Sequence, residues 1–218
     1  MLITEDMATC NQGILGDFSG KIGPVIGSNW RGKQVMRSLP TKSKQASSKA
    51  QQLQRDKFAY VIQFLNPIKE LLMATFGDNT GTKTPFNNAL SYHLKEVAQQ
   101  TATSFTMRYD KLLISKGTLC GIETPVLTNA TPNALLLQWT DNSNQGLAHA
   151  NDSLIVIAYA PNLDRFEFFL EVAFREKTQV ALEFCEDFQG QSVELWASFN
   201  NTNAMSSATS RYLGSIVL

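Results

Sequence analysis

The part of this sequence that comes closest to a chemical motif is a glycine-rich segment near the N-terminus. Its residues 13–21 end in Gly-Lys, as a phosphate-binding loop does. Such a loop continues with a Ser or Thr that binds magnesium and then opens a helix, whereas here Ile22 follows and no helical pattern begins. The spacing of Gly13 and Gly16 also fails the dinucleotide-binding pattern. The segment therefore predicts neither nucleotide binding nor a nucleotide cofactor.

Side chains that act as nucleophiles, acids or bases are present, but they lack the spacing of a catalytic site. The chain has no Gly-x-Ser-x-Gly motif, and neither His93 nor His149 has a motif partner. We expect His93 at the surface or boundary of a helix, because a lone helical histidine needs a positioned partner for catalysis. The paired carboxylates belong to alternating strands, in which they point to solvent: Glu167 with Glu171, and Glu183 with Glu186 and Asp187. The sequence predicts a protein that is not an enzyme.

The cysteines do not form a disulfide framework or a metal site in this reading. Cys10, Cys120 and Cys185 are odd in number, far apart and without a Cys-x-x-Cys spacing. Two histidines add too few ligands for a mixed site. We predict neither metal nor any other cofactor.

Charge is distributed unevenly along the chain, although the formal net charge is zero. Residues 1–118 carry 15 Lys+Arg and 8 Asp+Glu, a net of +7, and residues 119–218 carry 4 and 11, a net of −7. Such a split is compatible with nucleic-acid binding, with head-to-tail assembly, or with two differently charged solvated surfaces. The basic run near Trp30 could neutralise phosphates: Arg31, Lys33, Arg37, Lys42, Lys44 and Lys49. Lys-rich linkers are common, so this run does not favour a nucleic-acid partner.

The N-terminus and the hydropathy pattern predict a soluble protein. Residues 1–7 contain acidic side chains and no apolar core of a signal peptide, and Met7 is an alternative start. No run reaches the roughly 18 apolar residues that a membrane helix needs. We expect synthesis in the cytoplasm without membrane insertion.

The glycine-rich segment is predicted to be a β-ribbon that either the rest of its own chain or another copy of the chain must support. We expect two strands, Lys21–Asn29 and Lys33–Leu39, joined by a turn over Trp30–Gly32. A two-stranded ribbon is marginal in water, so it needs a partner surface. The predicted interface residues are Phe18, Lys21, Gly23, Val25, Gly27, Trp30, Arg31, Lys33, Val35 and Arg37. A β-carbon at Gly23 or Gly27 would block close approach to that surface.

The residues after the ribbon predict helices and then a β-sandwich, so that the fold class is α+β. Regions 1–40, 41–103 and 104–218 are expected to hold the ribbon, a linker with helices, and a strand plus the sandwich. The apolar spacing predicts helices over 49–65, 68–76 and 85–99, the last one capped by Thr84, and an alternating strand from Ser104 to Asp110 that continues or bulges toward Ser115. Seven further strands are predicted over 119–128, 134–140, 153–159, 166–174, 179–184, 193–199 and 211–217.

Seven short strands in about 100 residues are typical of an immunoglobulin-like or fibronectin-III-like sandwich. Trp139 alternates inward with Leu135 and Leu137, and we predict it as the core anchor between the sheets. Trp196 falls on the other face of its strand and would need a neighbouring element to cover it. A fragment from about Lys116 to Leu218 is expected to fold by itself.

The glycine-rich segment, with its pattern G-x-F-S-G-K-x-G-x-V-x-G-x-x-W-x-G, resembles the opening of an uncharacterised Bacteroidota protein family of about this length. Later segments are similar to the same family: Gln51-x-x-Gln-Arg55-x-x-Phe58, Phe64-Leu-Asn-Pro67, Thr84-Pro-Phe-Asn87 and Trp139-x-Asp141-Asn. The hairpin followed by Gln-x-x-x-Arg-x-x-Phe is also similar, more loosely, to some phage-encoded proteins that look like virion components. Neither resemblance implies a catalytic residue.

These observations favour a structural or assembly protein, a self-associating subunit of a virion, a tail-like device or a filament. Its partners would be copies of itself or other structural proteins, and it could end in a virion or another extracellular assembly. The alternative is a cell-surface module that binds carbohydrate or protein through the sandwich loops around residues 142–151 and 200–207. An enzyme without a visible motif is the third reading.

Overall fold

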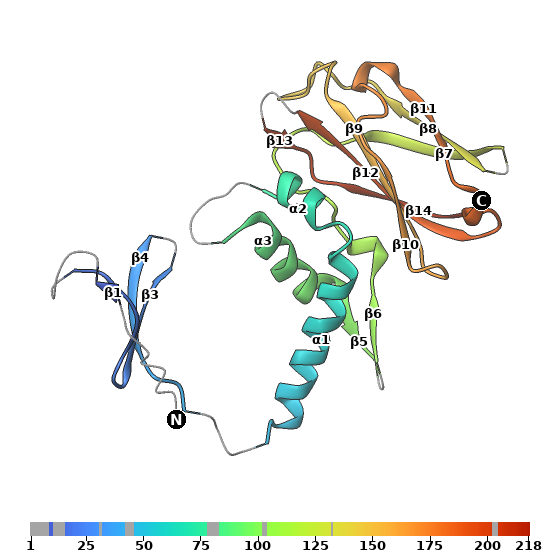
Figure 1. The fold of residues 1–218 in the computed structure, drawn as a ribbon. Helices are drawn as coiled ribbons and strands as arrows, with labels where there is room; N and C mark the ends of the chain where they lie inside the picture. Colours follow the sequence, from blue (N-terminus) through green and yellow to red (C-terminus); the bar gives the residue numbers. More distant parts are fainter. Residues whose placement is uncertain are drawn as a thin grey trace. The chain divides into compact units, whose positions relative to one another are not determined.

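The computed structural model describes residues 9–10, 16–30, 32–41, 46–77, 83–101, 104–131, 133–201 and 205–218. The chain divides into two compact units, Met1–Lys49 and Ala50–Leu218. The N-terminal unit contains the predicted ribbon. The second unit contains both the helices and the sandwich, which the sequence had suggested as separate regions (Figure 1).

The described part of the N-terminal unit is a four-stranded antiparallel sheet in the order β1-β2-β3-β4. Its strands are β1 Thr9–Cys10, β2 Phe18–Ile22, β3 Val25–Trp30 and β4 Lys33–Ser38. The predicted turn between β3 and β4 is confirmed, since Trp30 pairs with Lys33. The prediction of one strand over 21–29 is wrong, because Gly23 has a positive φ of 55° and turns the chain with Pro24.

Gly27 has a role inside this sheet. A β-carbon there would overlap the ring and the carbonyl oxygen of Phe18, which belongs to the neighbouring strand β2. Gly23, by contrast, has open space around it and serves the turn. The prediction that a β-carbon at Gly23 would block close approach is therefore wrong. Glycine suits this position because the backbone has a positive φ.

Three helices form where their sequence patterns predict them, but the third is shorter than the predicted 85–99, because helical structure ends at Val97 and a strand begins at Ala98. They are α1 Lys49–Leu65, α2 Lys69–Thr75 and α3 Pro85–Tyr92, followed by a π-helical turn, η1 His93–Val97. The Thr84 side chain accepts a hydrogen bond of 3.2 Å from the Asn87 amide, and Pro85 begins the helix. The strand expected from Ser104 is shorter, since β6 Phe105–Met107 pairs with β5 Ala98–Gln100 and gives way to a 3₁₀ turn, η2 Tyr109–Lys111.

The C-terminal strands build the predicted fibronectin-III-like sandwich. They are β7 Glu123–Thr131, β8 Ala134–Thr140, β9 Ser153–Ala160, β10 Arg165–Phe169, β11 Gln179–Glu183, β12 Ser192–Asn201, β13 Ser206–Ser207 and β14 Arg211–Val217. Within the described residues one sheet has the order β11-β8-β7, and the other has β10-β9-β12 with β13 and β14 both paired to β12. Distributing seven main strands over two antiparallel sheets in this way is typical of immunoglobulin-like sandwiches. The mixed α+β fold class is confirmed.

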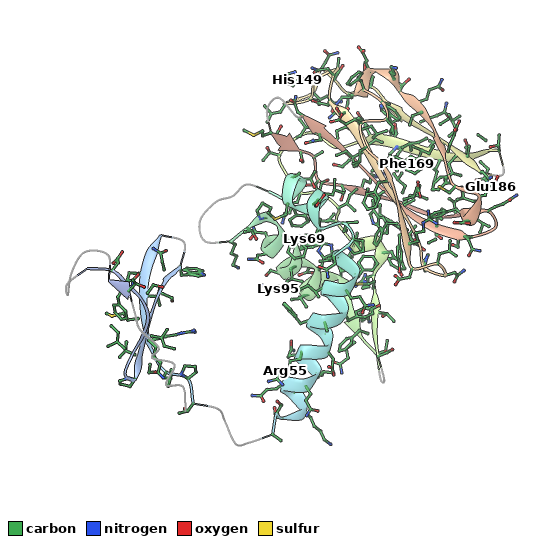
Figure 2. All side chains as sticks on the ribbon, viewed as in Figure 1. Arg55, Lys69, Lys95, His149, Phe169 and Glu186 are labelled. Carbon is green, nitrogen blue, oxygen red and sulfur yellow. The ribbon has the colours of Figure 1, made fainter. Side chains whose placement is uncertain are left out.

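Two cores lie on opposite faces of the sheet that contains β9 and β12. Between the sheets, Trp139 is buried with Leu137, Leu154 and Phe199, which confirms it as a core residue. The dense side chains around Phe169 in Figure 2 mark this interior. On the outer face, a second core joins the helices to the sheet and includes Trp196.

The second core explains why Trp196 is fully buried although it faces away from the sandwich interior. Its indole Nε1 donates to the Tyr109 carbonyl oxygen at 3.0 Å, and its ring lies 6.1 Å from the Tyr109 ring. Every residue of β9 is buried because both of its faces are covered. The helices are thus the third layer of one packed unit.

Candidate interaction site

The N-terminal sheet gathers five of the ten predicted interface residues on one face. Residues directly opposite each other in antiparallel strands share a face, and successive residues alternate. Lys21 pairs with Ile26, which pairs with Arg37, and Trp30 pairs with Lys33. We call this surface the basic face, and its charged and apolar side chains are Lys21, Ile26, Trp30, Lys33, Val35 and Arg37. No carboxylate belongs to the described strands of this sheet.

The other predicted interface residues are distributed elsewhere in the sheet. Phe18 and Val25 belong to the opposite face, together with Ile22 and Met36. Gly23 and Gly27 shape the backbone, as described above. Arg31 lies outside the described residues. The strand register therefore separates the predicted interface residues between the two faces of the sheet.

This sheet has no core of its own. Among the described residues of Met1–Lys49, Gly27 is the sole buried position. Large apolar side chains remain exposed, with 52% for Trp30, 66% for Met36 and 49% for Ile22. Small isolated sheets without an apolar core are marginal in water, and contiguous exposed apolar surface marks an interaction site. The sheet is suited to docking against a partner surface.

The second unit carries an apolar groove between α2 and the edge of the sandwich. The groove has a volume of about 650 Å³. Its apolar lining includes Leu71, Ala74, Ile155, Phe168 and Leu170, and its charged lining residues are Glu70 and Glu171. Within the described residues no cation lines it. Residues from four distant segments form this groove, so no local sequence pattern could have revealed it.

A second hollow of about 590 Å³ lies beside α3 and has a different character. Lys83, Lys95 and Lys116 line it, with Tyr92 and Glu96. The Lys116 Nζ lies 5.5 Å from the centre of the Tyr92 ring, and Lys95 is labelled in Figure 2. Three exposed lysines favour small anions, but Glu96 partly offsets their charge.

A buried ion pair lies beside the sandwich loops proposed for the alternative binding role, and one residue of each loop hydrogen-bonds to it. Arg175 and Asp152 are both fully buried, with 3.0 Å between Nη2 and Oδ2. Asn142 accepts from Arg175 at 2.5 Å, and Asn201 donates to Asp152 at 2.8 Å. These loop side chains serve the fold. Residues 202–204 of the second predicted loop lie outside the described residues.

His93 is buried, so the prediction of a surface or boundary position is wrong. Its Nδ1 donates to the Ala89 carbonyl oxygen at 2.7 Å, and its Nε2 makes no hydrogen bond of normal geometry with the described residues. Burial lowers the pKa of His93 from 6.5 to about 4, and the Ala89 and Leu113 backbone groups oppose this shift only in part. The π-helical turn that begins at His93 changes the helical phase, which the sequence period could not show.

Stability should therefore decrease in acid through His93. The folded-state pKa lies below the unfolded value, so the unfolded chain binds more protons between pH 6.5 and about 4. As the pH falls through this window, the lowered pKa of His93 should decrease the free energy of unfolding by up to about 3 kcal/mol. Urea unfolding of the wild type and His93→Phe from pH 7 to pH 4 measures the difference. Parallel pH dependence in the two proteins would contradict the prediction.

Over the described ranges, no group of three His, Cys, Asp or Glu side chains is placed to hold a metal ion. Within the same part of the chain, no helix combines the length and apolar character needed to cross a membrane. Cys120 and Cys185 are free thiols.

These features define a mixed α+β protein in which a coreless N-terminal sheet precedes a helix-covered fibronectin-III-like sandwich. The chain belongs to DUF6266, a family of unknown function, whose model matches residues 17–214. No curated protein matches the sequence. The chain is similar to the fn3 domain of human collagen alpha-1(XX) chain, with 14% identity, a TM-score of 0.34, and coverage of 46% of this chain and 88% of that one.

The chain is also similar to the FN1–FN3 domains of chicken CNTN1. The identity is 9% and the TM-score is 0.35, with coverage of 55% of this chain and 36% of that one. The fibronectin-III-like character of the sandwich is defined by the strand order described above.

Proposed function

We propose that this protein is a non-enzymatic structural subunit that associates with copies of itself through its N-terminal sheet. The observation that supports the proposal is a sheet in which no apolar side chain with described burial is buried, and whose basic face combines Trp30 and Val35 with three cations. An exposed surface of this composition is stabilised when another surface covers it. A virion, a tail-like device or a filament is the kind of assembly that fits such a subunit.

Charge supports association between copies. The unit Met1–Lys49 has 7 Lys+Arg and 3 Asp+Glu, a net of +4, whereas Ala50–Leu218 has 12 and 16, a net of −4. Opposite charges on two parts of one chain steer encounters between the basic part of one copy and the acidic part of the next.

Deleting residues 1–40 should abolish association without unfolding the second unit. Both hydrophobic cores lie within Ala50–Leu218, so the shortened protein keeps its thermal transition. Sedimentation velocity over a range of concentrations should show large species for the full chain and a monomer for the deletion. A full chain that stays monomeric at high concentration would overturn the proposal.

A variant inside the sheet distinguishes specific association through this sheet from nonspecific aggregation. Gly27→Val introduces side-chain atoms where the Phe18 ring lies, so it should distort the sheet while leaving the second unit intact. We expect this variant to behave as the deletion does. Association that persists in both proteins would exclude the N-terminal sheet as the contact.

A further inference from the structure

We propose that the apolar groove beside α2 is the receptor for the basic face of the N-terminal sheet of a second copy of this chain. This inference rests on the proposed self-association and names its contact. The groove combines an apolar lining with two carboxylates, Glu70 and Glu171. The basic face combines apolar side chains with three cations and no acidic strand residue. The two surfaces are complementary in both respects.

The groove is large enough for an aromatic anchor. Its volume of about 650 Å³ lies in the range of pockets that enclose drug-sized ligands. Tryptophan is enriched among the residues that dominate binding energy, because its large apolar ring can also donate a hydrogen bond. Trp30, at the end of β3 and 52% exposed, is the bulkiest side chain of the basic face and the natural occupant.

The edge of the sandwich is shaped so that apolar side chains face this groove. Phe169 pairs with Val156 and Phe174 pairs with Ser153, so residues 170–173 oppose two residues of β9. This bulge includes Glu171, whose φ is 54°. Bulges at sheet edges redirect side chains and end regular pairing. Leu170 in this bulge is 53% exposed, and Phe168 in the regular strand before it is 41% exposed; both line the groove.

The contact joins different surfaces of identical chains and is therefore heterologous. Each copy offers one basic face and one groove, so contacts can repeat from copy to copy. Such head-to-tail contacts close into a ring or extend as a filament, depending on the rotation between copies. The contact between basic face and groove thus sets the direction in which further copies add to the assembly.

A charge exchange in the full-length protein tests this contact. The sheet variant carries Lys33→Glu and Arg37→Glu, and the groove variant carries Glu70→Lys and Glu171→Lys. By sedimentation velocity, each variant alone should associate at least 10-fold more weakly than the wild type, because like charges then face each other. An equimolar mixture should recover association, since every contact between the two variants pairs opposite charges. Raising the salt concentration should weaken the wild-type contact, as exposed charge pairs are screened within about 10 Å at 0.1 M.

The matched control changes net charge equally but lies outside the groove. Glu176 and Glu183 are exposed and do not line it, so Glu176→Lys with Glu183→Lys should associate as the wild type does. If the groove variant associates normally while the sheet variant does not, the groove is not the receptor and the proposed self-association stands. A wild type that is monomeric at every concentration would overturn both the groove contact and the proposed self-association. This result is expected if each sheet covers the groove of its own chain.

Discussion

Replacing Asp152 by alanine is expected to lower the free energy of unfolding by about 3–5 kcal/mol. The change leaves the Arg175 guanidinium buried without its counter-charge, since both side chains are fully buried in the folded protein. Removing one partner of a buried ion pair is costly because the remaining charge has lost its water without compensation. Urea unfolding of the full chain measures the loss.

The surroundings of Arg175 explain why this pair holds several segments together. Its guanidinium donates to Asp152, to Asn142 and to the carbonyl oxygens of Cys120 and Gly121. It also lies 3.9 Å from the centre of the Phe199 ring. Its own carbonyl oxygen accepts from the Trp139 indole at 2.8 Å. One side chain therefore joins the chain before β7, the loop after β8 and the strand β12.

An exposed ion pair in the same unit provides the control. Arg165 and Asp187 are 2.8 Å apart, with 46% and 69% of their side chains exposed. Asp187→Ala should cost less than about 1 kcal/mol, because solvent screens such pairs. Replacing both buried partners, as in Asp152→Ala with Arg175→Met, should cost less than Asp152→Ala. A loss below about 1 kcal/mol for Asp152→Ala would show that the pair does not stabilise the fold.

Local patterns predicted the elements whose formation depends on nearby residues. Thr84 and Pro85 begin α3, and the alternation of β8 places Trp139 in the sandwich core. The missed turn at Gly23-Pro24 had a readable local signal, since a Gly-Pro pair marks turns.

Contacts between distant segments could not be predicted in this way. Arg175 and Asp152 are separated by 23 residues and carry no motif, so their pairing depends on how the sandwich closes. His93 is buried beside the rings of Phe76 and Tyr92, whose centres lie 6.0 and 5.4 Å from its own, and Phe76 comes from a different helix-end segment of the chain. The groove requires α2, β9, the end of β10 with the residues that follow it, and β12 together. Each of these features is a property of the packed unit.

One long-range feature did have a sequence signal. Residues 153–160 are almost continuously apolar instead of alternating, and a strand of this kind is covered on both faces. In the structure, Leu154 and Val156 face the sandwich core, whereas Ile155 and Ile157 face the core shared with the helices. The sandwich therefore depends on the helices for half of the surface that β9 buries.

This dependence changes the expectation for the isolated sandwich. The strand count predicts that residues 116–218 fold by themselves, but this fragment lacks α1, α2 and α3. Without them Ile155, Ile157, Tyr159, Phe166 and Trp196 would be exposed on one face of the sheet. An apolar surface of that extent promotes aggregation. We now expect the fragment 116–218 to aggregate or to lack a cooperative thermal transition, whereas the fragment 50–218 should be folded.

Polar substitutions on the uncovered face distinguish aggregation caused by the exposed apolar surface from a general loss of stability. In the fragment 116–218, Ile155→Thr with Ile157→Thr should increase the soluble fraction, because both side chains face the missing helices. The matched substitution Val156→Thr on the opposite face should not, since Val156 belongs to the core between the sheets. Size-exclusion chromatography and amide dispersion report solubility and folding. A monomeric, well-dispersed fragment 116–218 without any substitution would show that the inter-sheet core suffices, and that the helices are an accessory layer on an independent sandwich.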